Sequence, residues 1–107
     1  MITIITVASH CPHSKVGGWA SWAVMEGKRH KVGGQIKRKT ASSNEAELCA
    51  ITNGLQVSLG FFKPPKNTLV LIQSDNLWAL DQFSNGNSSN RIVQDAHSIY
   101  CILSETY

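Results

Sequence analysis

The sequence predicts an α+β fold in which helices pack on a mixed β-sheet. Three observations lead to this prediction. Residues 2–38 contain three strand-like segments joined by short connections. Helical periodicity begins near residue 42, and a short apolar run follows it. Short connections favour an antiparallel meander, whereas a strand reached through a helical crossover pairs in parallel, by a right-handed connection, with a strand already in the sheet.

Three strands are expected in the first third of the chain. The segment Ile2 to Ala8 is β-branched and apolar almost throughout, which is typical of a strand buried on both faces. A turn-forming loop at residues 9–15 separates it from a second strand, Trp19 to Met25. A hairpin turn at residues 26–28 then leads into a third strand from about Arg29 to Arg38.

The pattern changes from strand to helix after residue 41. Ser42 and Glu45 have the spacing of a capping box, in which each side chain accepts a hydrogen bond from a backbone amide near the other. Gly60 and the Pro64-Pro65 pair are expected to end the helix. Between these limits, apolar residues recur on one helical face, at Leu48, Ile51, Leu55 and Leu59.

The rest of the chain predicts one more strand and two helices. Thr68 to Ile72 is a short apolar run typical of a buried strand. A short helix over residues 76–83 and a polar loop over residues 84–90 follow it. The last amphipathic helix runs nearly to Tyr107, with apolar positions at Ile92, Ala96, Ile99 and Leu103. The order is therefore β-β-β-α-β-α-α, in a single domain spanning residues 1–107.

Composition supports one folded domain and excludes several classes of protein. The chain has 107 residues, 42% of them hydrophobic and 16% charged, which suits a single core and excludes a disordered tail. A formal net charge of +3 allows an anionic partner.

Three irregularly spaced cysteines argue against a secreted disulfide framework, so we expect reduced thiols and a cytoplasmic location. No apolar run is long enough to span a bilayer, and the first residues lack signal-peptide features, so no membrane partner is expected.

Two carboxylates occupy positions where α/β sheets form ligand sites. Asp75 follows the apolar run ending at Ile72, at the carboxyl end of the fourth strand. Glu47 lies in the first turns of the helix that Ser42 caps, and the crossover brings both acids toward the same strand end. Taken singly, each also has a structural explanation, because an acid near a helix start is stabilised there and Asp75 suits the cap of the next helix.

Four short motifs follow one another along the chain: Thr6-Val7-Ala8-Ser9, Gly17-Gly18-Trp19-Ala20, Ser43-Asn44-Glu45-Ala46-Glu47-Leu48 and Ile72-Gln73-Ser74-Asp75-Asn76. In sequence, order and spacing they resemble the ribonuclease H family, over roughly residues 2–83. The resemblance implies a ribonuclease H-like mixed sheet, here without the family's fifth strand and last helix. It also implies Mg²⁺-dependent cleavage of the RNA strand of RNA·DNA hybrids, with two Mg²⁺ ions held by four acids. Glu47 and Asp75 match the second and third acids.

The chain departs from the family at the other two acids. Val7 stands where the family has its first Asp, which bridges both ions, and a valine has no lone pair to give a metal. The family's fourth acid follows a fifth strand that has no counterpart before Tyr107, and Asp95 comes too early to replace it. Glu47 and Asp75 supply only two negative charges against the four positive charges of the ion pair. We therefore expect weak Mg²⁺ binding, at one site at best, and impaired or absent cleavage.

The missing fifth strand would leave the apolar fourth strand at an edge of the sheet. An apolar edge strand favours association with another chain. Two interpretations stay open at this point. Either the 107 residues are a fragment of a longer domain, or a partner or a second copy covers that edge.

A cationic segment and the helix start are the candidates for nucleic-acid binding. Residues 28–39 contain six Lys or Arg and no acid, which favours phosphate binding, although lysines that protect a solvated hairpin edge explain the pattern too. Ser42 and Asn44 match family positions that contact the hybrid, where an Asn reaches a 2′-hydroxyl. Cys11 matches a loop position near the hybrid. The candidates are Cys11, Ser42, Asn44, Lys28, Arg29, Lys31, Lys37, Arg38 and Lys39.

Other interpretations of these residues exist. His10, Cys11 and His13 invite a zinc site, but ligands so close in sequence are crowded, and no second cluster completes a tetrahedron. A non-catalytic nucleic-acid-binding or assembly module on the same scaffold is the alternative function. It would keep its binding after both acids are replaced. A third interpretation takes Val7 as an engineered inactivating change in an otherwise ordinary enzyme.

Overall fold

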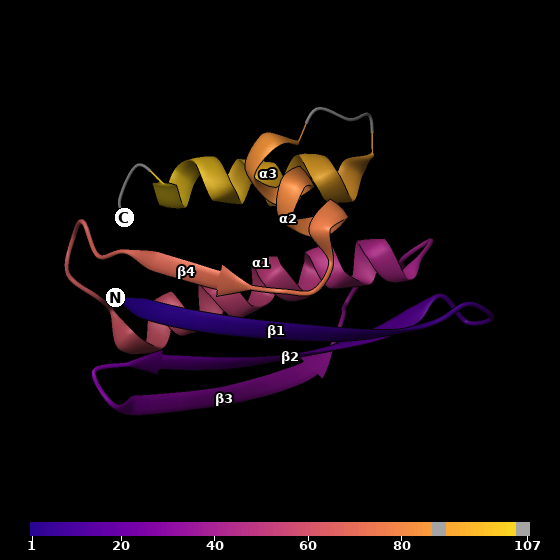
Figure 1. The fold of residues 1–107 in the computed structure, drawn as a ribbon. Coiled ribbons are helices and arrows are strands. Elements are labelled where there is room, and N and C mark those ends of the chain that lie inside the picture. Colours follow the sequence, from indigo (N-terminus) through magenta and orange to yellow (C-terminus); the bar gives the residue numbers. More distant parts are fainter. Residues whose placement is uncertain (87–89, 105–107) are drawn as a thin grey trace.

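The computed structural model describes residues 1–86 and 90–104, and the elements follow the predicted order (Figure 1). Within these residues no helix is both long enough and apolar enough to span a bilayer. The last helix follows the prediction as far as Ser104, and residues 105–107 lie outside the described part. The elements are β1 (Ile2–Cys11), β2 (Val16–Met25), β3 (Lys28–Gln35), α1 (Ser43–Phe62), β4 (Val70–Gln73), α2 (Leu77–Asn85) and α3 (Arg91–Ser104).

The described strands form one mixed sheet in the order β3-β2-β1-β4. β2 pairs antiparallel with both β1 and β3. β4 returns through the α1 crossover and pairs in parallel with β1, from Ile2 opposite Val70 to Ile5 opposite Gln73. The predicted α+β class, the meander and the parallel fourth strand are therefore confirmed. Among the described strands, β4 also has the edge position that the sequence predicts.

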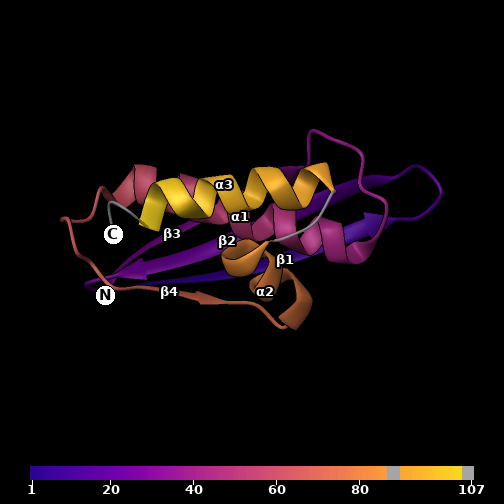
Figure 2. The ribbon, with the colours of Figure 1, turned by 90° about the horizontal axis from the view of Figure 1, so that it is seen from above.

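The described helices lie on one side of the sheet (Figures 1 and 2). α1 contacts β1 and β2, and α2 and α3 pack against α1. The closest approach is at Gly54, where an added Cβ would lie 2.9 Å from both Thr6 Cγ2 and Ser21 Oγ. The main core lies between these layers and includes Ile2, Ile4, Ala23, Leu48, Ile51, Leu55, Leu59, Phe83 and Val93.

The opposite face of the sheet carries no helix in the part of the chain that the structure describes. The expectation that the first strand is buried on both faces is therefore wrong. Ile4 and Thr6 face α1 and are 0% and 2% exposed, whereas Ile5 and Val7 are 41% and 46% exposed. Neighbouring strands continue this uncovered surface. We call it the outer apolar stripe, and it consists of Ile5, Val7, Trp22, Val24 and Leu71.

α1 extends beyond Gly60, where the sequence predicts its end, and stops at Phe62. Lys63 then adopts a left-handed conformation with φ 46°, and its amide donates a hydrogen bond to Leu59 O. This is a common way to satisfy the last carbonyls of a helix. Pro64 follows and has no amide hydrogen with which to continue the ladder. The prolines therefore limit the helix more strongly than the glycine does.

β3 ends at Gln35, before the predicted end of the third strand. The Ile36 amide still donates to a carbonyl of β2, but the chain then leaves the sheet. The Thr40 amide donates to Lys15 O in the β1–β2 connection, with N···O 3.1 Å. Residues 36–42 therefore form a loop that runs past the hairpin tip to the start of α1, and we call it the α1-entry loop.

Candidate functional site

Glu47 links the first turns of α1 to the central strand of the sheet. Its Oε1 accepts a hydrogen bond from the Ala8 amide of β1, with N···O 3.2 Å. Its Oε2 is buried and has no hydrogen-bond partner within the described residues. A buried carboxylate oxygen without a partner is unfavourable, and a cation or a proton would stabilise it.

Asp75 follows β4 and lies exposed at the same end of the sheet. Burial of Glu47 is the main cause that raises the pKa of its carboxyl; the Ala8 amide partly offsets this, and the negative charge of Asp75 adds to it. The two carboxyl groups are thus close enough to repel each other. The structure brings together the two acids that the sequence singles out.

Val7 lies at the level where the two acids meet. The last parallel pair of β1 and β4 is Ile5 with Gln73, so Val7 lies two residues further along β1 and Asp75 lies two residues beyond the end of β4. Val7 also directly precedes Ala8, whose amide binds Glu47. Val7 therefore lies near the end of β1 where the acidic pair forms, and its isopropyl group offers no oxygen to a cation.

The acidic pair fits a single divalent cation and does not fit two. The unpartnered Oε2 of Glu47 and the repulsion between the acids are both relieved by one positive ion. Two Mg²⁺ ions carry four positive charges, against two negative charges on these side chains. Within residues 1–86 and 90–104, no three His, Cys, Asp or Glu side chains gather as a possible metal site. Water would therefore have to supply most ligands of a bound Mg²⁺.

The start of α1 lies next to the acidic pair. Ser42 Oγ accepts a hydrogen bond from the Glu45 amide at 3.3 Å, and Glu45 Oε1 accepts one from the Ala41 amide at 2.9 Å, so the predicted cap is present. Asn44 is exposed on the first turn, and its Oδ1 accepts a hydrogen bond from Asn76 Nδ2 at 2.8 Å. This bond ties the start of α1 to the start of α2 and leaves the NH₂ group of Asn44 as a donor for a ligand.

Cys11 lies exposed at the end of β1. Hydrogen bonds from Ser14, and a weaker one from the His13 backbone, lower the pKa of its thiol. The neighbouring His10 is engaged elsewhere, because its Nδ1 lies 2.8 Å from Thr40 Oγ1 in the α1-entry loop. The hairpin tip is therefore fixed against the loop that precedes α1.

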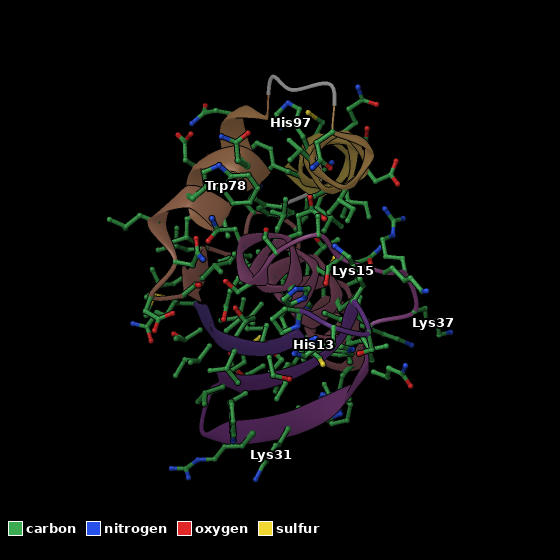
Figure 3. All side chains as sticks on the ribbon, turned by 90° about the vertical axis from the view of Figure 1, so that its right-hand side faces the viewer. His13, Lys15, Lys31, Lys37, Trp78 and His97 are labelled. Atoms are coloured by element: carbon green, nitrogen blue, oxygen red, sulfur yellow. The ribbon has the colours of Figure 1, made fainter. Side chains whose placement is uncertain are left out.

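The cationic segment does not form one patch, because the structure divides it into two groups. β3 spans roughly 23 Å from Lys28 to Gln35 at ~3.3 Å per residue, so its first residues lie far from the loop that follows its end. Figure 3 views the end of the sheet where the acids lie, with Lys37 on the α1-entry loop and Lys31 apart from it on β3. Lys31 Nζ lies 5.4 Å from the ring centroid of Trp22, on the outer apolar stripe. We name the hairpin-end group (Lys28, Arg29 and Lys31) and the site-end group (Lys37, Arg38 and Lys39).

Arg38 differs from the other cations because it has an acidic partner. Its Nη2 lies 2.9 Å from Asp95 Oδ2 of α3, and both side chains are largely exposed. An exposed pair of this kind contributes about 0–1 kcal/mol to stability. Asp95 therefore forms an ion pair beside α3, and the structure gives it no part in the acidic pair.

Lys15 is a site-end cation that the sequence analysis missed. It lies in the connection between β1 and β2, and its carbonyl accepts the Thr40 amide. Figure 3 shows Lys15 and Lys37 on the same side of the molecule. Residues 15 and 40 are far apart in the sequence, and no local pattern predicts that these two loops meet.

Comparisons with known proteins identify the fold. No family model and no curated protein matches the sequence. Among solved structures, the chain is similar to LC11-RNase H1, which was crystallised in complex with an RNA/DNA hybrid. The match has a TM-score of 0.76 at 19% identity and covers 99% of this chain and 78% of that one. At this level of identity the similarity establishes the architecture, and the chain has the ribonuclease H-like fold that its motifs predict.

Proposed function

We propose that this chain is a nucleic-acid-binding domain of the ribonuclease H type whose hydrolytic centre is incomplete, and that its partner is an RNA·DNA hybrid. The observation that carries the proposal is the meeting of Glu47 and Asp75 beside the start of α1 and the site-end group. The similar protein of the same fold was crystallised with such a hybrid, which supports this class of partner.

The site end of the molecule offers the groups that bind a phosphodiester backbone. α1 is 20 residues long, and its N-terminus presents backbone amides and the positive end of the helix dipole. Lys15, Lys37 and Lys39 add positive charge around this terminus. The NH₂ group of Asn44 suits a 2′-hydroxyl, the group that distinguishes RNA from DNA. We expect binding that weakens with salt and favours a strand containing ribose.

Glu47 and Asp75 are the residues that would hold Mg²⁺. When bound, the ion stabilises developing negative charge and lowers the pKa of a bound water. Glu47 is held in place by the Ala8 amide, which leaves Oε2 for the ion. Because Val7 contributes no oxygen, we propose that the pair holds one ion weakly and that hybrid cleavage is slow or undetectable.

A binding experiment with matched double variants tests the proposed interface. Labelled RNA·DNA hybrid, DNA duplex and RNA duplex are titrated with the protein at several salt concentrations, followed by fluorescence anisotropy. Lys37→Met/Lys39→Met is expected to weaken hybrid binding about tenfold and to reduce the salt dependence by about one or two ions. Lys28→Met/Lys31→Met removes the same charge at the hairpin end and is expected to have a smaller effect. Equal effects would contradict the site-end assignment, and absence of hybrid binding would overturn the proposal.

A cleavage assay tests the incomplete centre. The chain is incubated with hybrid in Mg²⁺ or in EDTA, and the products are separated on a gel. We expect little or no Mg²⁺-dependent cleavage, and robust cleavage would refute the impaired centre. Glu47→Gln and Asp75→Asn distinguish a non-catalytic binding module from a domain with a working metal site. If both variants bind hybrid as the parent does, with and without Mg²⁺, the chain is a binding module; loss of binding that high Mg²⁺ restores indicates a working metal site.

An assembly role is a second candidate, favoured by the edge of the sheet. β4 pairs only with β1 among the described strands, and Leu69 and Leu71 are 67% and 41% exposed. An apolar edge strand with free backbone groups is a template for another strand. We propose that a second copy covers this edge, which concentration-dependent sedimentation would detect.

A further inference from the structure

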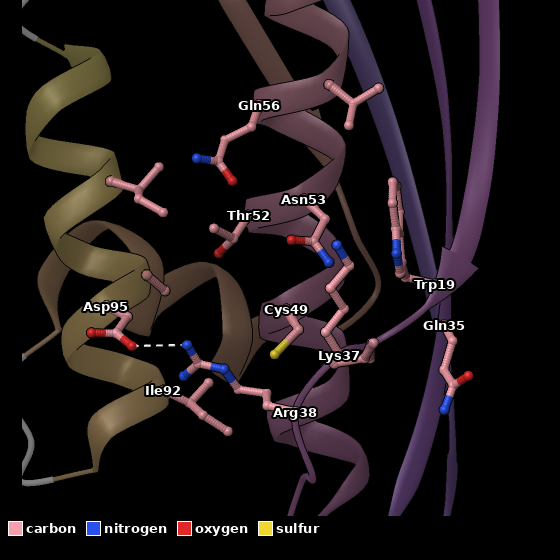
Figure 4. A pocket seen from close by; sticks show the side chains of 14 residues that line it. Trp19, Gln35, Lys37, Arg38, Cys49, Thr52, Asn53, Gln56, Ile92 and Asp95 are labelled. Atoms are coloured by element: carbon pink, nitrogen blue, oxygen red, sulfur yellow. Dashed lines mark hydrogen bonds and ion pairs between the residues drawn. The ribbon is translucent and has the colours of Figure 1, made fainter.

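A separate cleft lies on the side of α1 away from the acidic pair. The end of β3, the α1-entry loop, α1 and α3 enclose a volume of about 620 Å³ (Figure 4). This is within the range of small-molecule sites, roughly 300–1,000 Å³. Gln56 lines the cleft, and it is nine residues after Glu47, which places the two on opposite sides of the helix at ~100° per residue.

One wall of the cleft is aromatic. Trp19 of β2 is half-buried against the small core cluster that includes Ile36 and Cys49. It also lines an adjoining hollow of about 590 Å³, which shares Lys37 with the cleft. An indole that is anchored on one side and open on the other provides a flat surface on which a planar ring can stack.

The wall of the cleft formed by α1 carries hydrogen-bonding groups. Asn53 and Gln56 are three residues apart on α1, so both side chains reach the same hollow. In Figure 4 the one contact marked among the lining side chains joins Arg38 to Asp95. The two carboxamides are therefore not engaged with other cleft residues. Each offers a donor and an acceptor, the combination that recognises the edge of a nucleobase.

The charge of the cleft favours an anion. Lys37 and Arg38 contribute two positive charges, and Asp95 contributes one negative charge. Cys49 at the base is a buried thiol whose pKa is raised, mainly by burial, so it remains neutral. Lys37 lies beside Asn53 near the Trp19 wall (Figure 4), where it can bind a phosphate close to a stacked ring.

We propose that this cleft binds a free purine nucleotide, with its base stacked on Trp19 and its edge toward the α1 carboxamides of Asn53 and Gln56, and its phosphate on Lys37. The inference does not depend on the proposed function: Lys37 belongs to both surfaces, but Trp19, Asn53 and Gln56 have no part in the proposed hybrid interface. Cleft binding and hybrid binding are measured separately, and the failure of one leaves the other unaffected.

Calorimetric titration of the whole chain tests the proposal, with AMP, adenosine, ribose 5-phosphate and inorganic phosphate as probes. AMP is expected to bind more tightly than any of the other three. Trp19→Leu should weaken AMP about tenfold through lost stacking and leave ribose 5-phosphate unchanged. Lys37→Met should weaken both phosphates about tenfold. The matched controls Trp22→Leu on the outer apolar stripe and Lys66→Met in the loop before β4 should leave AMP binding unchanged.

Two further variants keep the test decisive if Trp19→Leu does not fold. Asn53→Ala and Gln56→Ala alter partly or fully exposed helix positions and are expected to weaken AMP about fivefold each, without changing ribose 5-phosphate. AMP that binds no better than ribose 5-phosphate would show that the base is not recognised and would overturn the proposal. Unchanged AMP affinity in both carboxamide variants, or no AMP binding by the parent chain, would overturn it as well.

Discussion

Thr6 and Val7 are neighbours on β1 whose side chains lie on opposite faces of the sheet. Thr6 is 2% exposed and packs where α1 comes closest, next to Gly54. Val7 is 46% exposed on the outer apolar stripe. The inner face packs against α1, whereas the outer face carries no helix in the part of the chain that the structure describes. A change of residue type at Val7 is therefore expected to leave the packing of the core intact.

This comparison explains how the ribonuclease H-like fold accommodates a valine at position 7. The core depends on side chains that face α1, and Val7 is not among them. A surface valine costs the sheet little, because β-branched residues are favoured in strands. A metal ion held by Glu47 and Asp75, by contrast, would depend on the charge at one point, and Val7 contributes no oxygen there. Fold and chemistry are thus separable in this molecule, and variants on each face test that separation.

The largest effect is expected on the inner face, at Gly54. A Cβ at this position would lie 2.9 Å from two buried side chains, so Gly54→Val overpacks the interface between helix and sheet. We expect a loss of about 2–3 kcal/mol in the free energy of unfolding, measured by urea denaturation. Gly60→Ala is the matched control, because an added Cβ at Gly60 meets no atom within 4 Å. It should stabilise the same helix by up to about 1 kcal/mol. Equal effects of the two changes would refute the close packing.

The next largest effect concerns the affinity of the acidic pair, Glu47 and Asp75, for Mg²⁺. Val7→Asp adds a third carboxylate beside Glu47 and Asp75 and is expected to raise Mg²⁺ affinity roughly tenfold or more, measured by calorimetry. Without Mg²⁺ the added charge should lower the melting temperature slightly, and Mg²⁺ should restore it. Ile5→Asp places the same charge on the same stripe, further from the strand ends, and serves as the control. No gain in affinity would contradict the placement of Val7 at the metal site, and no gain in cleavage would count against an engineered inactivation.

The sequence predicts the inner face and the site end well because their signals are local. The order of elements, the Ser42 cap and the two acids at strand and helix ends all follow from short patterns. The prediction is wrong for the outer face, because the run Ile2 to Ala8 carries apolar residues on both faces, Ile2 and Ile4 on one and Ile5 and Val7 on the other. Burial on one face only depends on what packs against the sheet, and the strand's own residues do not encode it.

The division of the cations has a similar cause. Residues 28–39 are continuous in sequence, but β3 ends inside the segment and carries its first part away from the site. Lys15 joins the site-end cations through a contact with Thr40, which lies on a distant loop. Such contacts arise from the tertiary fold, so composition along the chain does not reveal them.

A smaller effect is expected for association through the edge of β4. Leu71→Lys places a charge on an exposed strand residue, which hinders both apolar contact and strand pairing. We expect self-association, measured by sedimentation, to weaken roughly fivefold, equivalent to about 1 kcal/mol of lost apolar burial. Leu77→Lys is the control, since Leu77 is 80% exposed but lies on α2, away from the sheet edge. Similar weakening by both variants would indicate association through another surface.

The smallest effect is a pH dependence that originates at Glu47. Burial raises the pKa of its carboxyl, so the folded state retains a proton that the unfolded state loses above about pH 4.3. Stability contributed by this group therefore falls as pH rises from there through the folded pKa, and the deficit persists at neutral pH. Glu47→Gln keeps an oxygen for the Ala8 amide and removes the charge. The variant should be slightly more stable than the parent in urea at pH 7, and this gain should vanish near pH 4.

The control for this last prediction is Glu26→Gln, which removes a carboxylate from the exposed turn between β2 and β3. Glu26→Gln should not be more stable than the parent at pH 7, because Glu26 is exposed to solvent at the opposite end of the sheet from the acidic pair. Added Mg²⁺ sharpens the comparison. An ion held by Glu47 and Asp75 stabilises the parent and not Glu47→Gln, so the order of stability should reverse as Mg²⁺ rises. A constant difference at all Mg²⁺ concentrations would show that Glu47 does not bind the ion.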